Sequence, residues 1–252
     1  MRALVLTAPN KLVLEEVPLP APGPGEVQVR VRACGICGSD VHGLAGRTGR
    51  RIPPLIMGHE AAGEIAALGA QVCGWKEGDL VTFDSTIYCG ECVPCRSGAI
   101  NLCEHRQVLG VSCADYRRHG AFAEYVTVPA RVLFRLPAGL AFEPAALAEP
   151  VAVAVHAVNR TPLAGPGACV AVVGAGMIGL LIVQVLRACG CARIIAVDLD
   201  AARLALARQL GATATVDAAT DPAGAILALT GGTGVDASFE VVGATMPLQT
   251  AI

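Results

Sequence analysis

The stretch CVAVVGAGMIGLLIVQVLRACG, residues 169–190, decides the fold of the second half of the chain. Its first five residues are all apolar, as in a strand buried on both faces, and the apolar residues after the glycines have the spacing of a helix. The motif G-x-G-x-x-G lies between them, at Gly174, Gly176 and Gly179. This order of strand, glycine turn and helix predicts a site where the N-terminus of a helix faces a pyrophosphate.

A carboxylate follows at the distance that dinucleotide binding requires. Asp198 ends the next strand-like run, RIIAVD, nineteen residues after Gly179. A carboxylate in this place can accept hydrogen bonds from both ribose hydroxyls of NAD and repel the 2′-phosphate of NADP, so NAD is the predicted cofactor. Arg203 is either a contact of the adenine or a solvated helix charge. The predicted cofactor-binding residues are Gly174, Gly176, Met177, Ile178, Gly179, Asp198 and Arg203.

Strand and helix patterns alternate from about residue 150 onward. Two more strand-like runs, ATATVDA at residues 212–218 and VDASFEVVG at residues 235–243, follow a helix-like run at residues 201–211. Such alternation predicts α/β structure with a doubly wound parallel sheet. Four strands are recognisable, whereas a complete dinucleotide domain has about six, so we expect an incomplete sheet in a chain truncated at its C-terminus. The predicted domains are residues 1–154 and 155–252, with the boundary inside a helix.

The first 150 residues have a different texture, with many short β-rich runs separated by glycine and proline. VQVRVRA, residues 27–33, alternates apolar and polar side chains, as a strand with one solvated face does. PLPAPGPGE, residues 18–26, is a turn cluster that no helix would tolerate. The pattern predicts a sandwich or a partly open β-barrel.

Composition excludes several classes of partner. The net charge is −2 and no basic stripe occurs, so we expect no nucleic acid. The most apolar run, Ala168 to Val183, has sixteen residues without a charge and contains a glycine turn, so it is slightly too short for a membrane span. The N-terminus has no apolar core typical of a secretory signal. Eleven cysteines in such a chain favour reduced thiols and metal binding in a cytoplasmic protein over disulfides.

Four cysteines form a closed metal-binding pattern. Two-residue spacings allow neighbouring thiolates to bind one ion, and a seven-residue loop can bring the fourth thiolate round to complete a tetrahedron. A site of four sulfurs without an open position predicts a structural zinc. Iron–sulfur clusters use similar runs, but the spacing before the last cysteine differs and no proline follows it. The predicted ligands are Cys89, Cys92, Cys95 and Cys103.

A second set of metal-ligand side chains lies in CGICGSDVHG, residues 34–43, and GHE, residues 58–60. A catalytic zinc takes three protein ligands and leaves one position open. Cys37 and His59 supply two ligands, and either Glu60 or the distant Glu149 supplies the third. Each also has a simpler interpretation, because Cys34 and Cys37 form a CxxC that is compatible with redox activity, and a lone histidine or glutamate can be structural.

These motifs together resemble the zinc-dependent medium-chain dehydrogenase/reductases, in particular the polyol (sorbitol, L-iditol) and threonine dehydrogenases. The resemblance covers the whole chain in order, through GICGSDVH, GHEAAG, the four-cysteine segment, GAFAEY, AEPVAVAVH and GAGMIG. It implies a GroES-like barrel followed by a Rossmann domain, with zinc and nicotinamide meeting between them. It also implies that Cys37, His59 and variably Glu60 bind the catalytic zinc, whereas Glu149 is a ligand or a neighbour that acts through water.

The resemblance further implies an NAD-dependent alcohol dehydrogenase with two zinc ions per chain, acting on a polyol or a related secondary alcohol. Ser39 and His42 would pass the hydroxyl proton to solvent. Threonine, 2,3-butanediol and sugar phosphates stay open as substrates, and so does a truncated, non-catalytic protein that binds zinc and NAD. Arg47, Arg50 and Arg51 belong either to a solvated loop or to an anion site. We expect the full-length form to be a homo-oligomer, a dimer or a tetramer. The predicted catalytic residues are Cys37, Ser39, His42, His59, Glu60 and Glu149.

Overall fold

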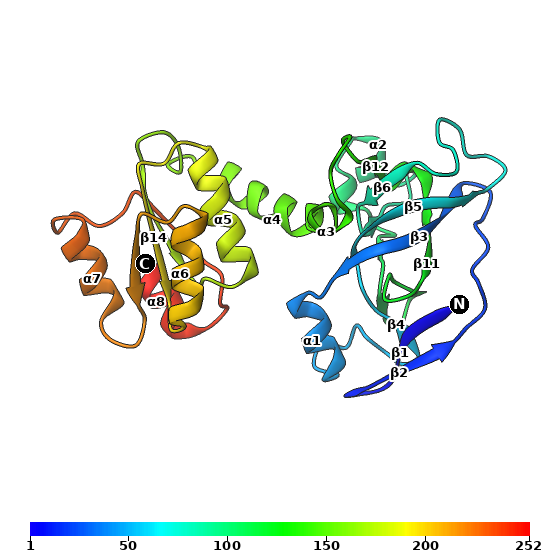
Figure 1. The fold of residues 1–252 in the computed structure, drawn as a ribbon, viewed down its shortest axis with the longest axis horizontal. Helices are drawn as coiled ribbons and strands as arrows, with labels where there is room; N and C mark the ends of the chain where they lie inside the picture. Colours follow the sequence, from blue (N-terminus) through cyan, green and yellow to red (C-terminus); the bar gives the residue numbers. More distant parts are fainter. The chain divides into compact units, whose positions relative to one another are not determined.

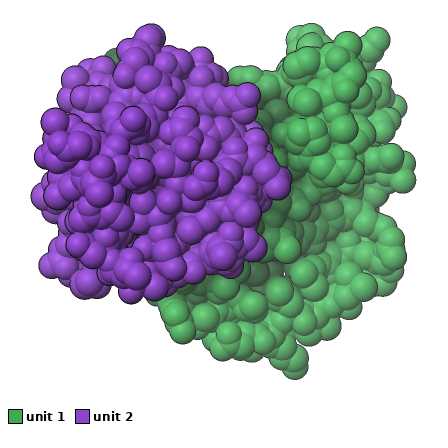
Figure 2. Space-filling view, turned by 60° about the vertical axis from the view of Figure 1, so that its left-hand side comes forward, with its two compact units in different colours: residues 1–149 green, residues 150–252 purple.

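The computed structural model describes all 252 residues and contains two compact units, residues 1–149 and 150–252 (Figure 2). The division falls inside helix α4 (Ala148–Asn159), five residues before the boundary expected from the sequence. The helix continues through the boundary because AEPVAVAVHAVN contains no glycine, and its proline lies in the first turn, where proline is tolerated. No helix of the structure combines the length and the apolar character that a membrane crossing needs.

Residues 1–149 are rich in antiparallel strands (Figure 1). The main sheet has the order β11 (Tyr125–Pro129), β3 (Glu26–Gly35), β5 (Glu60–Leu68), β6 (Leu80–Phe83) and β12 (Leu133–Arg135). A second sheet has the order β2 (Lys11–Glu16), β1 (Arg2–Ala8) and β4 (Leu55–Ile56). Two short ribbons pair β7 (Thr86–Ile87) with β8 (Gln107–Val108) and β9 (Val111–Ser112) with β10 (Arg117–Arg118). The helices are α1 (Gly38–Leu44), α2 (Val93–Arg96) and α3 (Phe142–Ala146), with 3₁₀ turns η1 (Ile100–Leu102) and η2 (Ala130–Val132).

The alternation in β3 fixes which of its faces is buried. Val27 and Val29 are fully buried in the core of this unit, whereas Arg30 is exposed. Gln28 departs from the predicted pattern because it is also buried, and its amide donates to the carbonyl of Pro20 at 2.6 Å. The hydrogen bond satisfies a polar group that would otherwise be costly to bury.

The pairing of β3 with β5 brings together two segments that lie about two dozen residues apart in the sequence. Gly35, at the end of β3, pairs with Glu60, at the start of β5, and Cys34 pairs with Ala61. The chain then turns from β3 through Cys37 into α1, while His59 directly precedes β5. The predicted ligands from both segments therefore lie at the same end of two neighbouring strands, where β3 stops and β5 starts.

Residues 150–252 form a parallel sheet with the order β15 (Ala214–Asp217), β14 (Arg193–Asp198), β13 (Cys169–Val173) and β16 (Ala237–Glu240). Val170 and Val172 point into the core formed with α4, α5 (Met177–Ala188) and α6 (Ala201–Leu210). Ala171 and Val173 point into the opposite core, which contains α7 (Pro222–Leu229) and α8 (Thr245–Ala251). Helices thus cover both faces, which confirms the predicted doubly wound parallel sheet.

Candidate metal centres and cofactor site

Cys37, His59 and Glu60 come together where β3 ends and β5 begins. Their ligand atoms all lie within 4.8 Å of one another, and His59 and Glu60 are buried while Cys37 is half-buried. The set offers sulfur, nitrogen and oxygen, the three donor types that proteins use for zinc. Three protein ligands leave a position open for water or substrate, as in catalytic zinc sites.

The environment of Glu60 fits a bound cation. The residue is only 1% exposed, and neither of its carboxylate oxygens has a hydrogen-bond partner. A Cβ at Gly35 would collide with Oε2, so the glycine on the paired strand provides the room that the carboxylate occupies. An isolated buried carboxylate costs several kcal/mol unless it is paired or coordinates a metal. A zinc ion between these three side chains would supply the missing partner.

His59 is held by a carboxylate that the sequence did not single out. Asp40, which is 2% exposed, places Oδ1 3.5 Å from His59 Nδ1, which leaves Nε2 as the nitrogen for a metal. Burial by itself lowers the pKa of His59, but Asp40 and Cys37 outweigh burial and raise that pKa to about 10. Two buried carboxylates, Asp40 and Glu60, thus lie at this centre, which favours the binding of a cation.

Asp40 also organises the start of α1. Its Oδ2 accepts a hydrogen bond from the backbone N–H of Cys37 at 3.1 Å, the N-terminal capping arrangement of a short helix. The three-residue spacing between Cys37 and Asp40 was the available signal, because a carboxylate at that position commonly caps a helix. Asp40 thus links the backbone of one candidate ligand to the ring of another.

The two residues expected to move a proton both lie on α1. Ser39 is half-buried and its Oγ accepts a hydrogen bond from Arg51 Nη2 at 3.5 Å. His42 is exposed, three residues further along the helix, so both side chains lie on one face of α1. This arrangement leads from the half-buried hydroxyl toward solvent, the direction that proton release requires.

Glu149 and Cys34 lie outside the three-ligand group. Burial raises the pKa of the Glu149 carboxyl; His59 opposes the rise, and Glu60, Asp84 and Asp40 add to it. The charges of this centre therefore act on the Glu149 carboxyl, but Glu149 is not one of the three clustered candidate ligands. Burial, with Asp40 and Glu60, raises the pKa of the Cys34 thiol to about 12, and a thiol that stays protonated is a poor redox nucleophile.

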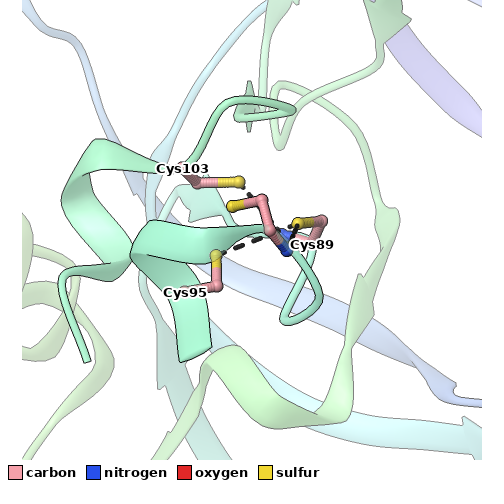
Figure 3. A group of neighbouring side chains, drawn as sticks. Cys89, Cys95 and Cys103 are labelled. Carbon is pink, nitrogen blue, oxygen red and sulfur yellow. Dashed lines mark hydrogen bonds between the residues drawn. The ribbon is translucent and has the colours of Figure 1, made fainter. Parts of the chain in front are cut away.

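The four cysteines predicted to bind a structural zinc, Cys89, Cys92, Cys95 and Cys103, also come together, with their sulfur atoms within 4.8 Å of one another. Residues 89–103 are called the four-cysteine lobe below, and Figure 3 shows Cys89, Cys95 and Cys103 of this lobe. α2 begins directly after Cys92, and its single turn carries Cys95 back toward Cys89, whose Sγ lies 3.9 Å from that of Cys95. The backbone N–H groups of Glu91 and Cys92 both donate to Cys89 Sγ at 3.3 Å and lower the pKa of that thiol to about 6. Four clustered sulfurs, one of them readily ionised, fit a tetrahedral zinc without an open position.

The glycine turn in residues 150–252 has the geometry of a phosphate-binding loop. Gly174 has a φ of +104°, and a Cβ at Gly179 would collide with the carbonyl oxygen of Gly174. Gly176 precedes the first turn of α5, and nothing lies within 4 Å of the position of a Cβ there. Met177 and Ile178 form that first turn. The open space at a helix N-terminus can admit a pyrophosphate.

Asp198 and Arg203 line a cavity of about 650 Å³ beside this turn. Asp198 Oδ2 accepts a hydrogen bond from the backbone N–H of Ala175 at 2.7 Å, which ties the carboxylate to the glycine turn. Arg203 Nη1 lies 3.9 Å from the same oxygen, and the arginine side chain is 57% exposed. A hydrogen-bonded carboxylate and an exposed guanidinium thus border a space large enough for a nucleoside.

Comparisons with known proteins agree with this architecture. Residues 23–138 match the family model of the alcohol dehydrogenase GroES-like domain, and residues 178–252 match the model of the zinc-binding dehydrogenases. Sorbitol dehydrogenase of Bacillus subtilis (strain 168) is 38% identical over 100% of this chain and 71% of its own length. L-threonine 3-dehydrogenase of Bacillus velezensis is 43% identical over 91% of this chain and 66% of its own length. The chain therefore spans about two thirds of the length of these relatives.

Solved structures give the same result. Alcohol dehydrogenase TADH from Thermus sp. ATN1 has a TM-score of 0.90 and 33% identity, and the match covers 100% of this chain and 73% of that one. A candidate zinc-binding dehydrogenase from Sinorhizobium meliloti 1021, solved with NADP bound, has a TM-score of 0.89 and 36% identity over 99% of this chain and 72% of that one. The sheets, the ligand clusters and these similarities lead to one conclusion: the chain belongs to the zinc-dependent medium-chain dehydrogenase/reductase family.

Proposed function

We propose that the protein oxidises a secondary alcohol, a polyol or a related compound, to the ketone, with transfer of a hydride to NAD and release of a proton. The observation that carries the proposal is the cluster of Cys37, His59 and the unpartnered, buried Glu60. When bound there, zinc would act as a Lewis acid and lower the pKa of a substrate hydroxyl. The names of the relatives support alcohol groups of sugars and amino acids as the class of substrate.

The chain's own residues would then perform the remaining steps. Ser39 would accept the hydroxyl proton as it passes its own hydroxyl proton on, and His42, exposed on the same face of α1, would release a proton to solvent. Asp40 would keep the ring of His59 oriented toward the metal, and Glu149 would affect the centre through its charge or a bridging water. Cys89, Cys92, Cys95 and Cys103 would hold a second, structural zinc.

NAD is the proposed nicotinamide cofactor. The relative from Sinorhizobium meliloti was solved with NADP, so membership of the family does not decide between the two cofactors. Asp198 supports NAD, because a carboxylate fixed beside the glycine turn would accept hydrogen bonds from the ribose hydroxyls and repel a 2′-phosphate.

The substrate can be identified by a dehydrogenase screen with NAD over polyols, sugar phosphates, 2,3-butanediol and threonine, with the zinc content measured in parallel. Oxidation of a polyol in preference to the others is the expected result. Zinc and NAD binding with no turnover of any alcohol would favour the non-catalytic alternative.

Cys37→Ser should abolish turnover and remove one zinc per chain, because the substitution deletes one of three proposed zinc ligands. The affinity for NAD should stay nearly unchanged, because Cys37 lies in residues 1–149 and the glycine turn lies in residues 150–252. Cys73→Ser, at an exposed cysteine outside both clusters, is the control. Metal analysis, NAD binding and steady-state rates measure the effects. Wild-type activity in Cys37→Ser would show that this metal assignment is wrong.

Cys89 should be an unusually acidic thiol in the metal-free chain. Because its pKa is about 6, its rate of alkylation by iodoacetamide should level off around pH 7, whereas a thiol with an ordinary pKa of about 8.5 continues to gain rate. Peptide mass spectrometry over a pH series measures this rate, and added zinc should protect Cys89 but not the exposed Cys73. A lack of protection would count against a metal in the lobe.

Asp198→Asn should shift the ratio of the dissociation constants for NADP and NAD by about tenfold in favour of NADP, because the change removes a negative charge that repels the 2′-phosphate. Asp217→Asn is a matched control, since Asp217 ends the neighbouring strand β15 and is exposed. Calorimetric titration of both cofactors measures the ratio. An unchanged ratio in Asp198→Asn would assign the discrimination to other residues.

A further inference from the structure

Arg51 is buried, although the sequence assigned it either to a solvated loop or to an anion site. Its side chain is only 7% exposed, so it belongs neither to a solvated loop nor to an open anion site. The neighbouring Arg47 and Arg50, by contrast, are exposed. A charged side chain is rarely buried to this extent unless it is paired, so its partners indicate what it does.

The guanidinium of Arg51 contacts the residues around the Cys37–His59–Glu60 centre. Nη2 lies 3.7 Å from Asp40 Oδ1 and 3.5 Å from Ser39 Oγ. Asp40 Oδ1 is the same atom that faces His59 Nδ1 at 3.5 Å. The carboxylate therefore lies between the imidazole and the guanidinium.

The chain fixes Arg51 in this position from two sides. Its Nη1 donates to the carbonyl oxygen of Arg50 at 3.1 Å, and the same carbonyl accepts from the backbone N–H of Ser112 at 3.2 Å. On α1, a Cβ at Gly43 would collide with Arg51 Cγ, so the buried glycine leaves the space that the arginine stem fills. The packing provides room for one long side chain that reaches Asp40.

We propose that Arg51 is a positioning residue of the metal centre: its guanidinium holds the Asp40 carboxylate against His59 and orients the hydroxyl of Ser39. The inference rests on the proposed function, because it assumes a zinc ion bound by Cys37, His59 and Glu60. Without the guanidinium, the Asp40 carboxylate keeps only His59 as a charged or proton-donating neighbour of Oδ1, and it is free to turn away from the ring. His59 then loses the contact that orients its ring.

The direction in which an Arg51 substitution changes the rate of zinc release distinguishes a positioning role from a purely electrostatic one. Removal of a positive charge near a cation site would by itself slow the release of zinc. Loss of the orienting contact weakens metal binding, and outer residues of this kind typically change metal affinity by about 10–100-fold. Faster release of zinc from an Arg51 variant would therefore indicate that Asp40 no longer orients the ring of His59.

The test follows the release of zinc from the zinc-loaded chain to a chromogenic chelator. The four-cysteine lobe serves as an internal reference, because a closed tetrahedral site should release its ion more slowly than a three-ligand site. Arg51→Met should accelerate the fast phase about tenfold and leave the slow phase unchanged. Arg51→Lys, which keeps the charge but lacks the planar fork, should give a smaller acceleration.

Gly43→Ala provides a second, independent variant, because it displaces the arginine without changing any charge, and it should also accelerate the fast phase. The controls are Arg50→Met, at the exposed neighbouring arginine, and Gly38→Ala, on the same helix with nothing within 4 Å of the new methyl group. Both controls should release zinc at the wild-type rate.

An unchanged or slower fast phase in Arg51→Met and Gly43→Ala would overturn the proposal. Equal acceleration of both phases would also overturn it, because that result indicates a general loosening of residues 1–149. If the wild-type chain itself releases only the slow zinc, the proposed function fails instead, since no metal then occupies the three-ligand centre.

Discussion

The structure of residues 1–149 depends on a buried concentration of negative charge that only a cation can balance. Glu60 has no hydrogen-bond partner for either oxygen. Asp40 Oδ1 also lacks a hydrogen bond, but it lies within 3.7 Å of Arg51 Nη2 and 3.5 Å of His59 Nδ1, so Glu60 is the carboxylate left without a partner. Burying such groups costs several kcal/mol each unless they are paired or bind a metal. Burial lowers the pKa of His59, but Asp40 and Cys37 beside its ring outweigh burial and raise that pKa to about 10. The antiparallel pairing of β3 with β5 creates this situation, because it places Gly35 opposite Glu60 and so leaves room for the carboxylate beside Cys37 and His59.

Much of the fold could be predicted because the local signals agree with the tertiary structure. The parallel sheet of residues 150–252 follows from buried apolar runs that end in glycine turns, and the strand order β15-β14-β13-β16 matches the first four strands of a doubly wound dinucleotide domain. The short helix α1 was not expected, because GSDVHGL has weak helix formers and begins within a metal-ligand motif. It forms because Asp40 caps its N-terminus and its buried face packs on Arg51.

The candidate site shows where sequence reasoning reaches its limit. Residue type and spacing predicted that Cys37, His59 and the four cysteines at positions 89, 92, 95 and 103 are metal ligands, and the structure gathers them into two clusters. The same signals left Glu60 and Glu149 equally eligible, and only the tertiary structure shows that Glu60 shares a 4.8 Å cluster with Cys37 and His59. Asp40 was missed, and Arg51 was assigned to a solvated loop or an anion site, for a different reason: a buried ion pair depends on which helix face meets which loop, and no periodicity in the sequence reports that contact.

The central claim is that a zinc ion lies between Cys37, His59 and Glu60. A crystal structure of the zinc-loaded chain, with diffraction data collected on both sides of the zinc absorption edge, tests it most directly. The account predicts two anomalous peaks, one among the four lobe sulfurs and one within bonding distance of Cys37 Sγ, a ring nitrogen of His59 and a carboxylate oxygen of Glu60, about 2.0–2.3 Å in each case. A peak in the lobe alone, with Glu60 buried and still without a partner, would contradict it.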